Sequence, residues 1–172
     1  MTLTVEIKPR YVQRAHQIAA QRNESFEKDS NWDNQQNDYG VDPVKRNFVG
    51  LMEEFAFAKH SELTVDTEDY EKTDGGEDFA VEFDGTYCSL DIKTVQKNPR
   101  ALFVKEGCAS ADYYVLGHLD GSQVEFLGMA SREQLLSTPL FETPYDHRNH
   151  EIPFADLSPI PEPEALNPIG SN

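Results

Sequence analysis

Two alternating runs joined by a tight turn constrain the fold more than any other part of the sequence. In residues 79–83, FAVEF, and again in residues 87–94, YCSLDIKT, apolar side chains take every second place. Side chains of a strand alternate between the two faces of a sheet, and Asp-Gly is a preferred pair in two-residue hairpin turns. These residues therefore predict a β-hairpin that turns at Asp84-Gly85.

The returning strand of this hairpin has an apolar face and a polar face. The apolar positions, which we expect in the core, are Cys88, Leu90 and Ile92. Asp91 and Lys93 lie on the opposite face, and pairing across the hairpin brings Asp78 close to Asp91. Two close carboxylates repel, which raises the pKa of at least one of them, and a bound divalent cation removes that cost.

This arrangement predicts a chemistry as well as a structure. A lysine beside a pair of metal-binding carboxylates can reach a phosphate oxygen, which is the equipment for metal-assisted phosphodiester hydrolysis. The alternative from the same residues is a structural ion pair between Asp91 and Lys93.

The rest of the chain predicts helices on both sides of a strand-rich segment. Helices are expected where a proline precedes apolar residues spaced by three and four, at residues 9–22 and 43–60. Further strands are expected at residues 100–105 and in a second hairpin, 111–130, across Asp120-Gly121, before a short helix capped by Ser131.

This order predicts an α/β fold with a mixed sheet and flanking helices. We expect a single domain over residues 1–138, with its core at about 43–137. Residues 139–172 contain most of the ten prolines and are expected to form an extension with little regular structure.

The charge of the chain restricts its partners and its surroundings. With 31 acidic and 15 basic side chains the net charge is −16, which on ordinary grounds argues against phosphate binding. The acids are spread along the chain, however, and an acidic surface is tolerated in molar salt, where the Debye length is ~3 Å. We therefore expect a halophilic host, with an acidic partner-binding protein or a DNA mimic as the alternatives.

The lack of a recognisable targeting signal and the small number of cysteines lead us to expect a cytoplasmic protein. No stretch resembles a transmembrane span, the start has no apolar signal region, and Cys88 and Cys108 cannot form a disulfide framework. We expect an intracellular protein that does not bind membranes, located in the host cytoplasm if it is viral.

The motifs of residues 43–137 resemble those of the PD-(D/E)XK phosphodiesterase superfamily, which includes restriction enzymes, resolvases and phage nucleases. That signature has a glutamate on a helix, an acid at the start of one strand and acid-X-lysine on the next. Glu54 in GLMEEFAFAKH, Asp78, and the run from Asp91 to Lys93 match it in this order. The proline that names the motif is absent before Asp78, where Gly-Gly-Glu stands.

The resemblance implies a restriction-endonuclease-like mixed β-sheet flanked by helices, and a magnesium- or manganese-dependent nuclease of phage or archaeal-virus type. Such a hydrolase would cut DNA as an endonuclease or exonuclease, and many relatives dimerise to cut both strands. Glu54, Asp78 and Asp91 would hold the metal, and Lys93 would position or deprotonate the attacking water. A non-catalytic nucleic-acid-binding protein of the same fold is the alternative.

The helix offers two glutamates for the metal, and the sequence favours Glu54. It borders the apolar face expected to turn toward the sheet, whereas Glu53 is expected to point toward solvent.

Other candidates have weaker support. His147 and His150 have a spacing compatible with zinc but no organising helix or cysteine. Thr94 and Gln96 follow the lysine and could contact substrate. The basic side chains nearest the predicted site, which could grip a phosphate backbone, are Lys45, Arg46, Lys97, Arg100 and Lys105.

Overall fold

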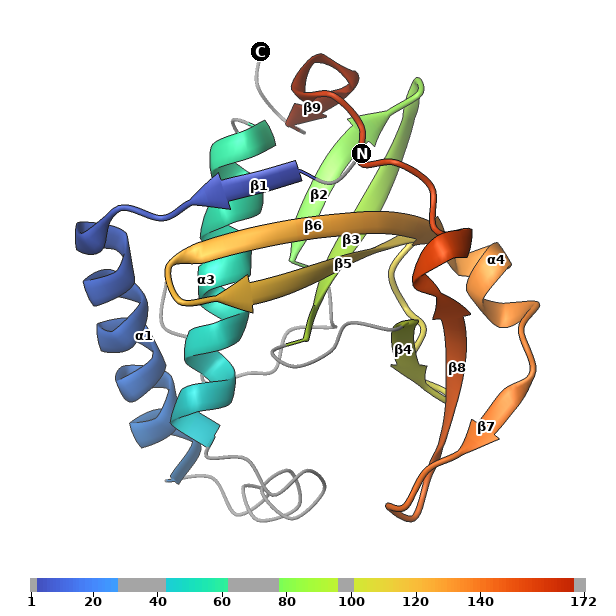
Figure 1. The fold of residues 1–172 in the computed structure, drawn as a ribbon, viewed down its shortest axis with the longest axis horizontal. Coiled ribbons are helices and arrows are strands. Elements are labelled where there is room, and N and C mark those ends of the chain that lie inside the picture. The colour runs from blue at the N-terminus through green and yellow to red at the C-terminus, as the bar shows by residue number, and fades with distance from the viewer. Residues whose placement is uncertain (1–2, 28–42, 62–77, 96–100, 169–172) are drawn as a thin grey trace.

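The computed structural model describes residues 3–27, 43–61, 78–95 and 101–168, and it has two sheets and flanking helices (Figure 1). A six-stranded mixed sheet has the strand order β1-β6-β5-β3-β2-β9, and a three-stranded sheet has the order β4-β8-β7. The α/β class, the mixed sheet and the flanking helices are therefore confirmed. In the view of Figure 1, α1 and α3 lie on one side and the small sheet on the other.

The bounds of the elements are as follows. The larger sheet contains β1 (Leu3–Glu6), β2 (Phe79–Phe83), β3 (Thr86–Val95), β5 (Tyr113–Asp120), β6 (Gln123–Ser131) and β9 (Leu166–Pro168). The smaller sheet contains β4 (Ala101–Lys105), β7 (Leu140–Glu142) and β8 (Arg148–Pro153). The helices are α1 (Pro9–Glu27), α3 (Pro43–Ser61) and α4 (Arg132–Leu136), with short 3-10 turns η1 (Phe154–Asp156) and η2 (Pro163–Ala165).

The first predicted hairpin is confirmed. Strands β2 and β3 pair antiparallel, with Phe79 opposite Leu90. At the turn, φ is 54° at Asp84 and 75° at Gly85. Two successive positive φ angles are typical of the type I′ turn, whose twist matches that of the strands.

The second predicted hairpin is also present, but its turn lies one residue later than expected. Asp120 pairs with Gln123, so Gly121 and Ser122 are the turn residues. Two-residue hairpin turns require a positive φ at their first position. Gly121 has φ of 63°, which glycine adopts without strain. The hairpin joins the first one through a parallel pairing of β3 with β5.

The main hydrophobic core lies between helices α1 and α3 and one face of the larger sheet. Cys88, Leu90 and Ile92 belong to it, as the alternation in β3 predicted. Phe57 of α3 packs against Phe79 and Phe126, with ring centroids 5.3 and 5.6 Å apart. Helix α3 is thereby packed against β6 and against β2, the strand that follows Asp78.

Helix α1 is longer than expected, ending at Glu27 instead of near residue 22. The added residues include neither proline nor glycine, so no strong helix breaker ends the helix earlier. Ser131 caps α4 as predicted, because its hydroxyl accepts a hydrogen bond from the Gln134 N–H at 3.1 Å.

A second core fills the space between the opposite face of the sheet and the smaller sheet. Its buried members include Leu102 of β4, Tyr114 and Leu116 of β5, and Ile152 of β8. The expectation of little regular structure after residue 139 is wrong, because β7, β8 and β9 all lie there. Proline cannot donate to a sheet, but Pro168 lies on the edge strand β9, and Pro153 lies beyond the part of β8 that pairs with β7, so each has one side without a neighbouring strand.

No helix within the described ranges is long and apolar enough to cross a membrane.

The C-terminal strand gives a test of this architecture. Leu166 is buried in the main core and pairs with Phe83, whereas Asn167 on the same strand is exposed. Leu166→Ala should lower the free energy of unfolding by about 2–5 kcal/mol, as measured by urea denaturation. Asn167→Ala is the control and should change it by less than about 0.5 kcal/mol. Equal small effects would show that β9 does not belong to the folded core.

Candidate active site

Asp78 is held at the start of β2 by the neighbouring strand. Its backbone N–H donates to the Leu90 carbonyl at 2.9 Å, and its Oδ2 accepts from the Ile92 N–H at 2.7 Å. Its side chain is also hydrogen-bonded to Asp91. The hairpin therefore brings these two carboxyl groups together, as the pairing predicted.

The environment of Asp78 favours its neutral form. Burial, the charges of Glu54 and Asp91, and the hydrogen bond to Asp91 raise its pKa to about 9, against the opposing effect of the Ile92 N–H. A protonated Asp78 can donate to Asp91 while it still accepts from Ile92. The influence of Glu54 also places that helix carboxylate near Asp78, so two of the predicted site residues, Glu54 and Asp91, act on a third.

Lys93 pairs with Asp91 on the polar face of β3. Its Nζ lies 2.5 Å from Asp91 Oδ2, with the Asp91 side chain 9% exposed and the Lys93 side chain 39% exposed. Burial alone would lower the pKa of Lys93, but the charge and hydrogen bond of Asp91 raise it. The ammonium group also lies 5.9 Å from the centroid of the Tyr114 ring, which favours a cation there.

The prediction that Glu53 faces solvent is wrong, because this residue is fully buried. Its Oε2 accepts a hydrogen bond from the Thr94 hydroxyl at 2.6 Å, and burial raises the pKa of its carboxyl group well above the usual value. Glu54 is partly buried. Both glutamates therefore lie toward the sheet, and the inward surface of α3 is wider than its apolar residues indicate.

The donor chemistry of Glu54, Asp78 and Asp91 suits a hard divalent cation, which prefers carboxylate oxygens. Among the residues that the structure describes, however, no group of three or more His, Cys, Asp or Glu side chains is arranged so that it could hold a metal ion. The hydrogen bonds of Asp78 and the ion pair of Asp91 engage oxygens that a cation would need. A cation would have to displace some of these contacts.

The weaker candidates are not brought together. His150 is buried on β8, whereas His147 precedes the strand and stacks on Tyr145 with ring centroids 6.2 Å apart. Thr94 contacts Glu53, as described above. Of the basic residues, Lys45, Arg46 and Lys105 are placed, whereas Lys97, Arg100 and also Gln96 fall outside the described residues.

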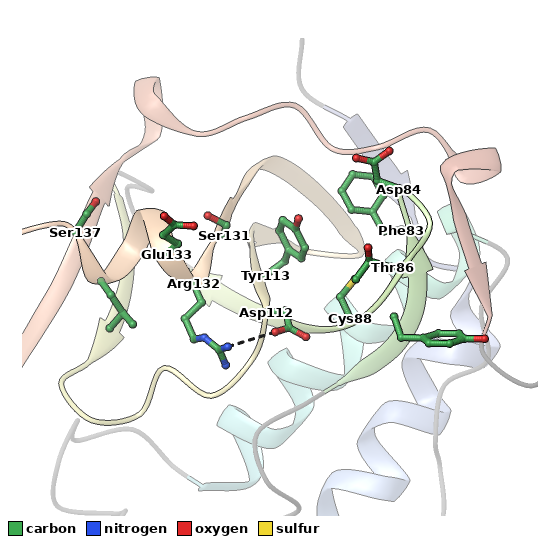
Figure 2. Close-up of a pocket in the computed structure, with 12 residues that line it drawn as sticks. Phe83, Asp84, Thr86, Cys88, Asp112, Tyr113, Ser131, Arg132, Glu133 and Ser137 are labelled. Carbon is green, nitrogen blue, oxygen red and sulfur yellow. Dashed lines mark ion pairs between the residues drawn. The ribbon is translucent and has the colours of Figure 1, made fainter.

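A groove of about 710 Å³ at the other end of β3 is a feature that the sequence did not predict (Figure 2). In its lining, Asp112 Oδ2 accepts from the Ser89 N–H at 2.9 Å, and Asp112 Oδ1 lies 3.5 Å from Arg132. Its charged lining consists of Asp84, Asp112, Glu133 and Arg132. Three carboxylates against one guanidinium disfavour a phosphate backbone here.

In comparisons with protein-family models, curated proteins and solved structures, none matches this chain.

The Asp78 carboxyl group makes the stability of the metal-free protein depend on pH. Its pKa rises from 3.8 to about 9 on folding, so its stabilising effect is full below pH 4 and is lost as the pH rises toward 9. In Asp78→Asn, the amide can accept from Ile92 and donate to Asp91 at any pH.

We therefore expect Asp78→Asn to gain stability over wild type as the pH rises from 5 to 9, with a slope of at most about 1.4 kcal/mol per pH unit. Urea denaturation in EDTA at several pH values measures this difference. A difference that does not change with pH would show that Asp78 titrates normally.

Proposed function

We propose that this protein is a divalent-metal-dependent nuclease of the restriction-endonuclease-like type that hydrolyses phosphodiester bonds of DNA. The observation that carries this proposal is the concentration of acidic side chains at one point of the sheet. Glu54 and Asp91 both raise the pKa of Asp78, and Lys93 pairs with Asp91. Strongly perturbed pKa values that arise from burial and specific charged neighbours cluster at functional sites.

The metal in this proposal is Mg²⁺ or Mn²⁺, held by Glu54, Asp78 and Asp91. The pKa of Asp78 supports this choice, because a group of like charges that must stay partly protonated is relieved by a bound cation. When bound, such an ion lowers the pKa of water and offsets charge on the phosphoryl group.

Lys93 acts in this proposal as a fixed positive charge. The neighbouring Asp91 raises its pKa, so the side chain remains an ammonium group at neutral pH. An ammonium group cannot accept a proton from water, but it can orient water and stabilise the negative charge that grows on the phosphate. Its electrostatic role is therefore favoured over a role as the base.

The direct test is a cleavage assay on linear, circular and branched DNA and on RNA, with Mg²⁺, Mn²⁺ or EDTA. Lys93→Ala should lower the cleavage rate by about 10²- to 10³-fold, as does the loss of one preorganised donor, and should keep Mn²⁺ affinity in calorimetry. Asp91→Ala should lose both. Lys8→Ala changes the net charge equally at an exposed position and should cleave like wild type.

Each other outcome points to a different protein. Binding of DNA without cleavage under all metal conditions would favour a non-catalytic binder of the same fold. Absence of DNA binding would favour an acidic protein that binds other proteins. A Lys93→Ala variant that cleaves at the wild-type rate would reduce the Asp91–Lys93 contact to a structural ion pair.

The acidic surface supports a halophilic origin, in an archaeon or its virus. With a net charge of −16, repulsion among the acidic side chains opposes folding, and their repulsion of phosphate groups opposes DNA binding, unless salt screens both. The melting temperature and the cleavage rate, both measured from 0.1 to 2 M KCl, should rise with the KCl concentration. A protein that is most stable and most active at 0.1 M would contradict this origin.

A further inference from the structure

Glu53 connects the helix of the proposed site to the strand of the proposed site. It is fully buried on α3, and its Oε2 accepts the Thr94 hydroxyl of β3 at 2.6 Å. Along the chain, Glu53 is the residue before Glu54, and Thr94 is the residue after Lys93. One hydrogen bond therefore joins the two elements beside the residues that each contributes to the site.

The neighbouring strand is shaped to receive this carboxyl group. Gly117 of β5 pairs with Thr94, and a β-carbon built on it would lie 2.8 Å from Cδ, Oε1 and Oε2 of Glu53. Any other residue at position 117 would push the carboxyl group away. Gly117 does not have a positive φ, so the backbone conformation does not require glycine here. The glycine matters because the missing side chain leaves space for the Glu53 carboxyl group.

Stability alone does not explain a carboxyl group in this place. Its Oε1 is buried without a hydrogen-bond partner. A buried polar atom without a partner costs free energy, and an apolar side chain of similar size would avoid that cost. The carboxyl group therefore lowers the stability of the fold through its Oε1, which indicates that it serves to position neighbouring residues.

We propose that Glu53, Thr94 and Gly117 form a positioning clamp that fixes Glu54 of α3 relative to Asp91 and Lys93 of β3. The clamp rests on the proposed nuclease function, and its residues touch neither metal nor substrate. It limits how far the carboxylates of the helix and of the strand can move apart, so it acts on metal affinity and turnover and not on DNA binding.

Thr94→Val tests the clamp, because it removes the hydroxyl and keeps the shape of the side chain. We expect Mn²⁺ affinity in calorimetry and kcat each to fall about 10- to 100-fold, as for other residues that orient metal ligands, with KM for DNA unchanged. Thr94→Ser restores the hydroxyl and should restore both values. Ser61→Ala is the control, since it removes a buried hydroxyl of α3 that does not contact β3 but is bonded to the Phe57 carbonyl of its own helix at 2.6 Å.

Two more variants separate a clamp from a metal ligand and from a merely structural contact. Glu53→Gln can still accept from Thr94, so it should keep Mn²⁺ affinity, whereas Glu54→Gln should lose it. Gly117→Ala should displace Glu53 and reproduce Thr94→Val, even if Thr94→Val itself fails to fold. The clamp is overturned if Glu53→Gln loses metal as Glu54→Gln does, or if Thr94→Val and Gly117→Ala match Ser61→Ala in Kd and kcat.

Amide hydrogen exchange keeps this test separate from the nuclease proposal. In the metal-free protein, Thr94→Val should speed exchange at residues 91–95 of β3 and leave the amides of β6 unchanged. If wild type neither binds Mn²⁺ nor cleaves DNA, the nuclease proposal fails and exchange alone decides. Faster exchange confined to 91–95 would then support the clamp, and an equal change in β6 would overturn it.

Discussion

The contact between Asp78 and Asp91 is the constraint around which the rest of the site is organised. The hairpin register places Asp78 beside Asp91, because Phe79 pairs with Leu90 and the Ile92 N–H binds the Asp78 carboxyl group. The repulsion of the two carboxylates is reduced by a proton on Asp78 and by the ammonium group of Lys93. Without metal, the site needs this proton and this ammonium group to remain stable. In the proposed function, a divalent cation would take over their part in reducing the repulsion.

The two cores explain why this contact can persist. Helix α3 packs on one face of β3 through Phe57 and the main core, and the smaller sheet packs near the other face through Tyr114 and its neighbours. The proposed site therefore lies between two rigid supports. The C-terminal strands contribute to both, since β8 pairs with β4 and β9 pairs with β2.

Local patterns in the sequence predicted most elements between residues 9 and 136, but not β1, the C-terminal strands or the long-range contacts. Alternation and an Asp-Gly turn predicted the β2–β3 hairpin and the approach of Asp78 to Asp91, since pairing follows from register. Strands β8 and β9 were missed because their partners, β4 and β2, are distant in the chain. Strand β7 pairs locally with β8, but it has only three residues, and the proline content of the segment outweighed the short alternation in β8. The burial of Glu53 was missed because helical periodicity was judged from apolar residues alone.

One sequence signal could have identified the position of Glu53. Gly117 interrupts an otherwise bulky strand, YYVLGHL, and a glycine inside a strand often marks the close approach of another group. Glu53 and Glu54 are about 100° apart around the helix, as successive residues are. Gly117 makes room for Glu53 over the sheet, and the next residue, Glu54, lies near enough to Asp78 to raise its pKa. Two adjacent, chemically identical residues can thus have different roles, because the strand beneath them has no side chain at one position.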